Sequence, residues 1–285
     1  MVKKMLLKNR NFMLFWVGQL ISKLGDFSLN IALPFYVYHL TGSSVALAVT
    51  FISRALPFLL IGPIAGVFVD RWNLRITMLA SDLLRAVSLV PICFVNSQDW
   101  VWIIWISSFF EASFGRFYDP AKQALIPSLV RKEELVKANG LSSLTESFTQ
   151  ILGPTIGGGI AAWLGFAPVV WIDIISYIVS AACILGIRLP TNNLAPKEQC
   201  RTIESIWSDL KEGIEIIVNT HMIRKVFITV TIYMISQGII NALLVIFIQG
   251  EFLRYAIDTW IHRSGPRIGD GYFGSCHWVD WITFC

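Results

Sequence analysis

Seven long apolar segments constrain this 285-residue chain more than any other feature. Each is long enough to cross about 30 Å of hydrocarbon, which takes about 20 helical residues. They lie at residues 12–38, 45–69, 76–97, 100–118, 140–164, 168–188 and 224–249. The composition, 55% hydrophobic and 15% charged, is also typical of a membrane protein. The sequence therefore predicts an all-α polytopic protein embedded in a lipid bilayer.

The Lys and Arg residues gather on one side of these predicted spans. Seventeen of the 23 fall in the N-terminal segment and in the loops after the second, fourth and sixth spans. The three opposite turns, near residues 41–44, 96–99 and 165–168, contain none. Because cytoplasmic loops carry the excess of Lys and Arg, the N-terminus is predicted to be cytoplasmic. The net charge of +4 thus reflects membrane orientation, and no nucleic-acid partner is expected.

A polar segment at 189–223 divides the chain. Residues 1–188 form a predicted N-terminal half of six helices, and 224–250 form a seventh span. Apolar residues recur in the polar segment at helical spacing, at Ile203, Ile206, Leu210, Ile214 and Ile217. We therefore expect a cytoplasmic linker with an amphipathic helix on the inner membrane face. Six spans, a linker and a further span are the organisation of two joined six-helix halves.

Charged side chains inside the predicted spans are the strongest functional signal. They are Lys23, Asp26, Arg54, Asp82, Arg85, Glu111, Glu146 and Asp173. A charge at the bilayer centre costs about 2.5–3.5 kcal/mol on insertion scales, so it normally lies in an ion pair, a protein interior or a wet cavity. Two pairs, Lys23 with Asp26 and Asp82 with Arg85, have the i, i+3 spacing that allows pairing on one helix face.

Asp26, Arg54 and Glu111 lie nearest to mid-membrane on the first, second and fourth spans. Burial favours the neutral form of a carboxyl group, so Asp26 and Glu111 are predicted to bind protons or to recognise a cation, with Arg54 as a partner. Asp82 and Arg85 are further candidates, and purely structural pairing is their alternative. Glu146 and Asp173 lie nearer the span ends and are expected at the membrane interface.

Two glycine-containing motifs lie in or beside the spans. The loop Gly66-Val-Phe-Val-Asp70-Arg71-Trp-Asn-Leu-Arg75 joins the second and third spans. Gly66 is expected to let two helices approach closely, and Asp70 to pair with basic side chains of the loop. The alternative is a tight charged turn that only sets topology. The second motif, Gly153-Pro154-Thr-Ile-Gly157-Gly158, is predicted to kink the fifth span and give it a smooth face.

No motif for catalysis, metal binding or a cofactor stands out in the sequence. The four His are scattered, and the spacings of the five Cys match no metal or redox site. Residues 157–159 are three glycines inside an apolar span, which is not the context of a nucleotide-binding loop. We expect no cofactor, and we expect that the protein is not an enzyme.

The whole set of features resembles the major facilitator superfamily, and within it the bacterial macrolide-efflux and siderophore-exporter group. The pieces that carry the resemblance, besides the 66–75 loop, are Leu24-Gly25-Asp26, Ala32-Leu33-Pro34, Arg54-Ala-Leu-Pro57, Gly62-Pro63-Ile-Ala-Gly66, Asp119-Pro120-Ala121, Ala124-Leu-Ile-Pro127, Ala138-Asn139-Gly140-Leu141 and the fifth-span glycine motif. The resemblance extends from residue 8 to about 249.

This resemblance implies two six-helix halves that rock around a substrate at the membrane midplane. It implies export of an amphiphilic small molecule, such as a macrolide, across a bacterial plasma membrane in exchange for protons. The 66–75 loop would latch the two halves on the cytoplasmic side, although Asn73-Leu74 replaces part of the usual Gly-Arg run. The fifth-span motif is associated with antiporters, and only its second half is present. A siderophore or lipid exporter, and a non-transporting scaffold or half-transporter, remain alternatives.

The sequence changes character at residues 251–285, which contain three Arg, two His and three Trp but no apolar span. The arginines would lie outside the cell, against the charge rule. We expect this tail to be translated out of frame from about Asp258, because a shifted frame can encode a Gly- and Ala-rich span. The chain would then be a truncated family member of low activity. A genuine extracellular tail is the alternative, and the gene's nucleotide sequence decides between them.

Overall fold

The computed structural model describes residues 9–69, 71–188 and 219–248. Every regular element in these ranges is a helix, which confirms the predicted all-α class. The longer elements are α2 (Arg10–Thr41), α3 (Ser44–Leu60), α4 (Gly62–Val69), α5 (Leu74–Leu89), α6 (Val101–Leu129), α7 (Leu135–Leu164), α8 (Phe166–Leu185) and α10 (His221–Phe247). The short 3-10 helices between them are η1 (Val90–Phe94), η2 (Gln98–Trp100) and η3 (Lys132–Glu134). The predicted linker helix and the 251–285 tail lie outside the described residues.

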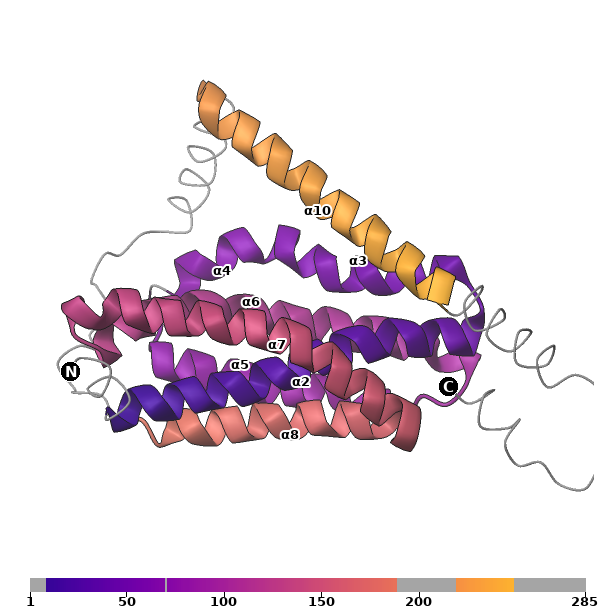
Figure 1. The fold of residues 1–285 in the computed structure, drawn as a ribbon, viewed down its shortest axis with the longest axis horizontal. Helices are drawn as coiled ribbons and strands as arrows, with labels where there is room; N and C mark the ends of the chain where they lie inside the picture. The colour runs from indigo at the N-terminus through magenta and orange to yellow at the C-terminus, as the bar shows by residue number, and fades with distance from the viewer. Residues whose placement is uncertain (1–8, 70, 189–218, 249–285) are drawn as a thin grey trace, which may run out of the picture.

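Helices α2 to α8 run side by side as a bundle, and α10 crosses over it at an angle (Figure 1). Helix α2 packs against both α7 and α8, while α5 packs against α6 and α8. Helix α10 contacts the bundle through α3 and α2. The first predicted span therefore supplies a central helix of the bundle, and the seventh covers one side of it.

The ends of α2 follow from two local sequence signals. Asn9 caps its start, because the side-chain oxygen accepts hydrogen bonds from the backbone N–H groups of Asn11 and Phe12. Its end is fixed by Gly42, whose φ of +59° lies in the left-handed region that glycine tolerates best. The chain then turns directly into α3, which Ser43 caps.

Two predicted spans differ from the observed helices. The second span is interrupted at Ile61, between α3 and α4, because Gly62 and Pro63 follow and proline removes a helical hydrogen-bond donor. The fourth span continues as α6 to Leu129, although we expected it to end at residue 118. Its extension buries an apolar face that includes Leu125. Helices α6 and α7 therefore also carry Lys122 and Lys137, which lie between the predicted fourth and fifth spans.

Two described stretches, Leu74–Phe94 and Phe166–Leu185, are long and apolar enough by length and composition alone to cross a bilayer. Helices α2 and α6 are longer, but they carry the charged side chains noted above. Several of those charges, such as Asp26 and Glu111, are buried in the bundle. Membrane-spanning helices tolerate such charges when they face a protein interior.

A polar layer crosses the middle of the bundle between two apolar clusters. One cluster includes Phe12, Phe15, Met78, Leu125 and Ile184, and the other includes Leu33, Val37, Ile92, Ile104 and Val170. The buried polar side chains between them are Gln19, Ser22, Asp26, Asp82, Arg85, Ser108, Glu111, Asp173, Ser176 and Ser180. They come from α2, α5, α6 and α8, so four helices bring their polar positions to one level.

Candidate functional site

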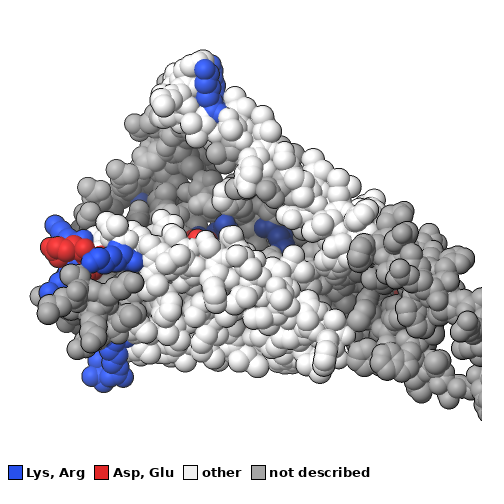
Figure 2. Space-filling model, viewed as in Figure 1, with Lys and Arg blue, Asp and Glu red and all other residues white. Residues whose placement is uncertain are grey.

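A cavity of about 540 Å³ opens on the polar layer between the bundle and α10. Its polar lining is Lys23, Asp26, Asn30, Arg54, Arg85, Glu111, Arg116, Asp119 and Asn241. Its apolar lining includes Phe27, Ile31, Phe35, Phe51, Leu244 and Val245. Charged atoms are visible in the hollow beneath α10, while the adjoining face of the bundle is almost uncharged (Figure 2). The cavity thus combines apolar walls with a concentrated group of charges.

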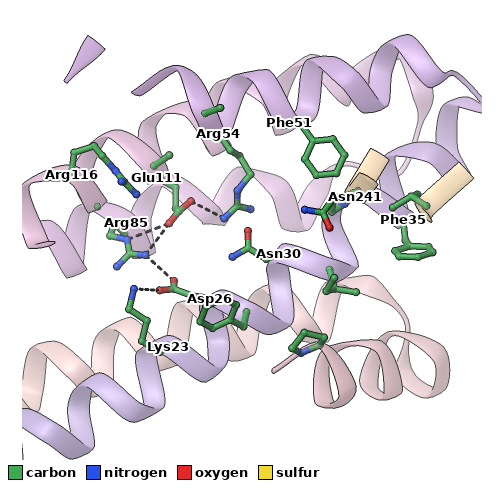
Figure 3. A pocket seen from close by; sticks show the side chains of 18 of the residues that line it. Lys23, Asp26, Asn30, Phe35, Phe51, Arg54, Arg85, Glu111, Arg116 and Asn241 are labelled. Atoms are coloured by element: carbon green, nitrogen blue, oxygen red, sulfur yellow. Dashed lines mark hydrogen bonds and ion pairs between the residues drawn. The ribbon is translucent and has the colours of Figure 1, made fainter. Parts of the chain in front are cut away.

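Arg85 is the centre of that group (Figure 3). Its Nη2 donates to Asp26 Oδ1 at 2.7 Å and to Glu111 Oε1 at 3.0 Å, and its Nε donates to Glu111 Oε1 at 3.2 Å. Asp26 comes from α2, Arg85 from α5 and Glu111 from α6. One guanidinium therefore ties three helices together at the level of the cavity.

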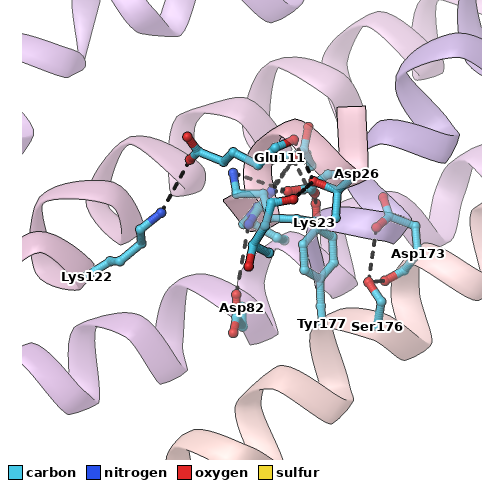
Figure 4. A network of polar contacts seen from close by, with 12 residues as sticks. Lys23, Asp26, Asp82, Glu111, Lys122, Asp173, Ser176 and Tyr177 are labelled. Carbon is cyan, nitrogen blue, oxygen red and sulfur yellow. Dashed lines mark hydrogen bonds and ion pairs between the residues drawn. The ribbon is translucent and has the colours of Figure 1, made fainter. Parts of the chain in front are cut away.

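Tyr177 of α8 belongs to the same network (Figure 4). Its hydroxyl makes a short hydrogen bond to Asp26 Oδ1 and lies 3.0 Å from Glu111 Oε1. The guanidinium of Arg85 lies over the tyrosine ring, 4.1 Å from its centroid, in a cation–π contact. Tyr177 is thus a fourth member of the network.

Two cations complete the network on its cavity side. Arg54 Nη2 lies 3.4 Å from Glu111 Oε2, and Lys23 Nζ lies 3.7 Å from Asp26 Oδ2. Every carboxylate oxygen of Asp26 and Glu111 therefore has a partner. The structure brings together the three predicted residues Asp26, Arg54 and Glu111, although Arg85 contacts both carboxylates more closely than Arg54 contacts Glu111.

Asp82 lies on the opposite side of Arg85 and does not line the cavity. The predicted i, i+3 contact is present but loose, with 3.9 Å between Arg85 Nη1 and Asp82 Oδ1. Arg85 instead makes its close contacts across helices. Asp82 is fully buried, and neither of its carboxylate oxygens has a hydrogen-bond partner among the described residues.

The expected interfacial position of Asp173 is wrong. Its side chain is 1% exposed and packs against Gly25 of α2, where an added Cβ would collide with Asp173 Oδ1. Ser176 Oγ donates to that same oxygen at 3.2 Å. Glu146 differs, because its side chain is 49% exposed and contacts Lys122 at 3.5 Å. The sequence could not separate these two positions, because helix rotation decides which of them faces the bundle.

In the described part of the chain, the charged loop at 66–75 contacts α8 of the same bundle. An added Cβ at Gly66 would meet no atom of the described residues within 4 Å, so none of the described helices approaches it closely. Arg75 Nε donates to the backbone oxygen of Ile184 at 3.1 Å, and its Nη2 donates to that of Leu185. These bonds cap the end of α8. Arg71 lies in the turn, and Asp70 lies outside the described residues.

The glycine motif of α7 is divided between two environments. An added Cβ at Gly157 would lie 2.5 Å from the backbone oxygen of Ser28, and one at Gly153 would collide with Phe27. Gly158, in contrast, faces open space. Pro154 lies inside the helix and lines the cavity. Gly153 and Gly157 thus provide the predicted smooth face, which packs against α2.

Several members of the polar layer were not predicted from the sequence. Tyr177 and Ser180 are the clearest cases, and a signal for them exists. Together with Asp173 and Ser176 they form an i, i+3, i+4, i+7 polar stripe on an otherwise apolar helix. Asn241 of α10 also lines the cavity, but an isolated Asn in an apolar segment carries no comparable pattern.

Comparisons with known proteins agree with this architecture. The family model described as Major Facilitator Superfamily matches residues 15–260, past the point where the sequence resemblance had ended. The chain is 26% identical over 273 residues to "Macrolide efflux protein A" of Streptococcus pyogenes, covering 93% of this chain and 67% of that protein. It is 26% identical over 243 residues to the protein of the same name from Enterococcus faecalis, covering 82% and 74%.

A Bacillus subtilis protein named "Uncharacterized MFS-type transporter YfiS" is 24% identical over 254 residues, covering 86% of this chain and 59% of that protein. The chain therefore spans about two thirds of the length of the curated relatives it matches. These matches confirm the predicted family resemblance.

Proposed function

Because this membrane protein belongs to the Major Facilitator Superfamily of transporters, we propose that its cavity binds an amphiphilic small molecule for proton-coupled export from a bacterial cell. The observation that carries the proposal is the pair of buried carboxylates, Asp26 and Glu111, at the cavity wall. They share Arg85 and Tyr177, so a change in the charge of either affects both. The proposed driving force is the proton gradient.

The geometry of Tyr177 supports a proton site. Its hydroxyl carries one hydrogen but lies within hydrogen-bond distance of both Asp26 Oδ1 and Glu111 Oε1. That hydrogen serves one carboxylate at a time. The other contact becomes favourable when its carboxyl group is protonated and donates to the tyrosine oxygen. The three side chains therefore suit the uptake and release of a proton.

The cavity lining supports an amphiphilic substrate. Phe27, Phe35 and Phe51 offer apolar surface for the body of a ligand, and the ion network lies beside them. A macrolide combines a large apolar ring with a basic amine. That amine would replace Arg54 at Glu111, because this is the longest contact that Glu111 makes in the network. The names of two relatives point to the same substrate class.

The proposed orientation places the start of α2 in the cytoplasm. Charged side chains gather at the end of the bundle where α2 begins and α8 ends, and the rest of that face is nearly uncharged (Figure 2). Together with the basic loops in the sequence, this distribution fits the positive-inside rule. We also propose, from the family resemblance, that the 66–75 loop faces the cytoplasm and that 189–223 link two halves of the transporter.

Binding of erythromycin to the purified chain in lipid nanodiscs tests the proposal. We expect saturable binding by isothermal titration calorimetry and a loss of affinity of at least tenfold, about 1.4 kcal/mol, in Glu111→Gln. Glu146→Gln is the matched control, because Glu146 lies outside the cavity. Absence of binding, or equal losses in the two variants, would contradict the proposed function.

The charge of the cavity favours one alternative, an exporter of anionic amphiphiles such as a siderophore or a lipid. Four cations line the cavity, Lys23, Arg54, Arg85 and Arg116, against three carboxylates. Arg116 Nε is buried without a hydrogen-bond partner among the described residues. In the same assay, tighter binding of a fatty acid than of erythromycin, weakened by Arg116→Gln, would support this alternative over the macrolide.

A further inference from the structure

Asp82, like Asp173, is a buried carboxyl group of the polar layer that the proposed function does not use. It lies on α5, is fully buried and is separated from the cavity by Arg85. Its carboxyl lies beside Ser180 of α8 and Tyr118 of α6, and Tyr118 lies beside Gln19 of α2. These four buried polar side chains come from α2, α5, α6 and α8 and form a second polar cluster, away from the cavity.

The hydrogen bonds of this cluster are incomplete. Both oxygens of Asp82, the hydroxyl of Ser180 and the amide nitrogen of Gln19 have no hydrogen-bond partner among the described residues. An ionised carboxylate without partners is very costly in an apolar interior, whereas a protonated carboxyl group is neutral and donates one hydrogen bond. Arg85 forms an ion pair of 3.9 Å with Asp82, which is too long for a hydrogen bond to the ionised form in this conformation.

Arg85 has a second arrangement available, however. Asp82 and Arg85 are three residues apart on one helix, a spacing at which side chains meet. In the structure the guanidinium faces Asp26 and Glu111, at 2.7 and 3.0 Å. A rotation of the Arg85 side chain toward Asp82 would exchange one set of carboxylates for the other.

We propose that Asp82 is a second proton carrier, which holds a proton while Arg85 binds Asp26 and Glu111 and loses it when Arg85 turns to Asp82. This inference deepens the proposed export function and rests on it for the link to transport. In the exchange, the O–H bond of Asp82 breaks and an O–H bond forms on Asp26 or Glu111. Arg85 keeps its charge, so the net charge of the cluster is unchanged and no electrons are transferred.

The surrounding charged and titratable groups are compatible with this exchange. They are Arg85 on the same helix, Lys23 and Asp26 on α2, Glu111 and Tyr118 on α6, and Tyr177 on α8. By charge alone, a neighbouring cation such as Arg85 favours an ionised Asp82, and a neighbouring anion such as Asp26 opposes it. Neutralising Asp26 or Glu111, by a proton or a bound cation, weakens their attraction for Arg85 and so favours its turn to Asp82.

Infrared spectroscopy of the purified chain in nanodiscs tests the protonation directly. At neutral pH and without ligand, we expect the protonated-carboxyl C=O band to lose a component in Asp82→Asn. Asp173→Asn is the matched control, and it should leave that component in place. Because Asn has the shape of a protonated Asp, Asp82→Asn should also keep the melting temperature of the parent chain.

Ser180→Ala provides a second variant that keeps the acid, and it should shift the frequency of the same component. An Asp82→Asn spectrum identical to the parent spectrum would overturn the inference, because Asp82 would then be ionised. Loss of the component on addition of sodium would also overturn it, because the cluster would then be a cation site.

Erythromycin separates this inference from the proposed function. Bound erythromycin should lower the pH at which the Asp82 component disappears, and binding without any such shift would overturn the exchange. If erythromycin does not bind while the Asp82 component is present, the proposed function fails and the protonation of Asp82 stands.

Discussion

The two sides of Arg85 differ in how their carboxylates are satisfied. On the cavity side, each oxygen of Asp26 and Glu111 has a cationic or hydrogen-bonding partner. On the other side, Asp82 has only an ion pair of 3.9 Å with Arg85 and no hydrogen-bond partner among the described residues, although it is also buried. The comparison teaches that burial alone does not describe the surroundings of these acids. Their partners differ, and the guanidinium of Arg85 lies between the two sets.

The largest effect is expected from Arg85→Gln. This substitution leaves Asp26 and Glu111 as uncompensated buried charges, so the chain should lose about 3–5 kcal/mol of stability. Unfolding by SDS in bicelles measures the change. Arg54→Gln removes a longer contact at the cavity edge and should cost much less. Equal stability of Arg85→Gln and the parent chain would mean that the cavity-side carboxylates are not ionised.

Glu111→Gln should have the next largest effect on stability. It removes charge-assisted hydrogen bonds from Arg85 and Arg54 but leaves Asp26 paired, so the expected loss is about 1.5–3 kcal/mol in the same unfolding assay. A loss as large as that of Arg85→Gln would show that Arg85 depends on Glu111 alone and does not bridge two acids.

A smaller loss is expected from Tyr177→Phe, which deletes the shared hydroxyl and keeps the ring beneath Arg85. Hydrogen bonds between membrane helices average about 0.6 kcal/mol, and the hydroxyl donates one at a time, so a loss of about 0.6 kcal/mol is expected. Tyr36→Phe, which removes the hydroxyl's 2.6 Å bond to the Val95 oxygen away from the polar layer, is a control for hydroxyl loss. Only Tyr177→Phe should alter erythromycin binding.

Asp82→Asn should have the smallest effect on stability. An acid that is already neutral loses no ionic contact when an amide replaces it. Thermal unfolding of the variant beside Glu111→Gln checks the ranking. A loss for Asp82→Asn as large as that for Glu111→Gln would show that the two sides of Arg85 are equivalent.

The sequence predicted the polar layer better than its internal contacts. The cost of placing a charge in a membrane marked Asp26, Arg54 and Glu111, and these residues do meet at one cavity. Helical spacing also pointed to Asp82 as a neighbour of Arg85. The sequence could not show that Arg85 turns to other helices, because that choice depends on how α2, α5 and α6 are rotated against one another.

The glycines show the same limit of prediction from the sequence. Gly157 and Gly66 both lie in apolar helical segments, and both were expected at close helix contacts. Gly157 packs against the α2 backbone, while an added Cβ at Gly66 would meet no atom in the part of the chain that the structure describes. The local sequence allows a close helix contact at both glycines. The placement of the neighbouring helix decides whether such a contact forms.

The most direct test is the pH dependence of erythromycin binding to the chain, measured below the pH at which the ligand's own amine loses its proton. If protons and substrate compete for the Asp26–Glu111 pair, affinity should rise with pH in the parent chain, because binding then displaces protons. Glu146→Gln should keep this dependence, and Glu111→Gln should reduce it. An affinity that is independent of pH in the parent chain would contradict the account.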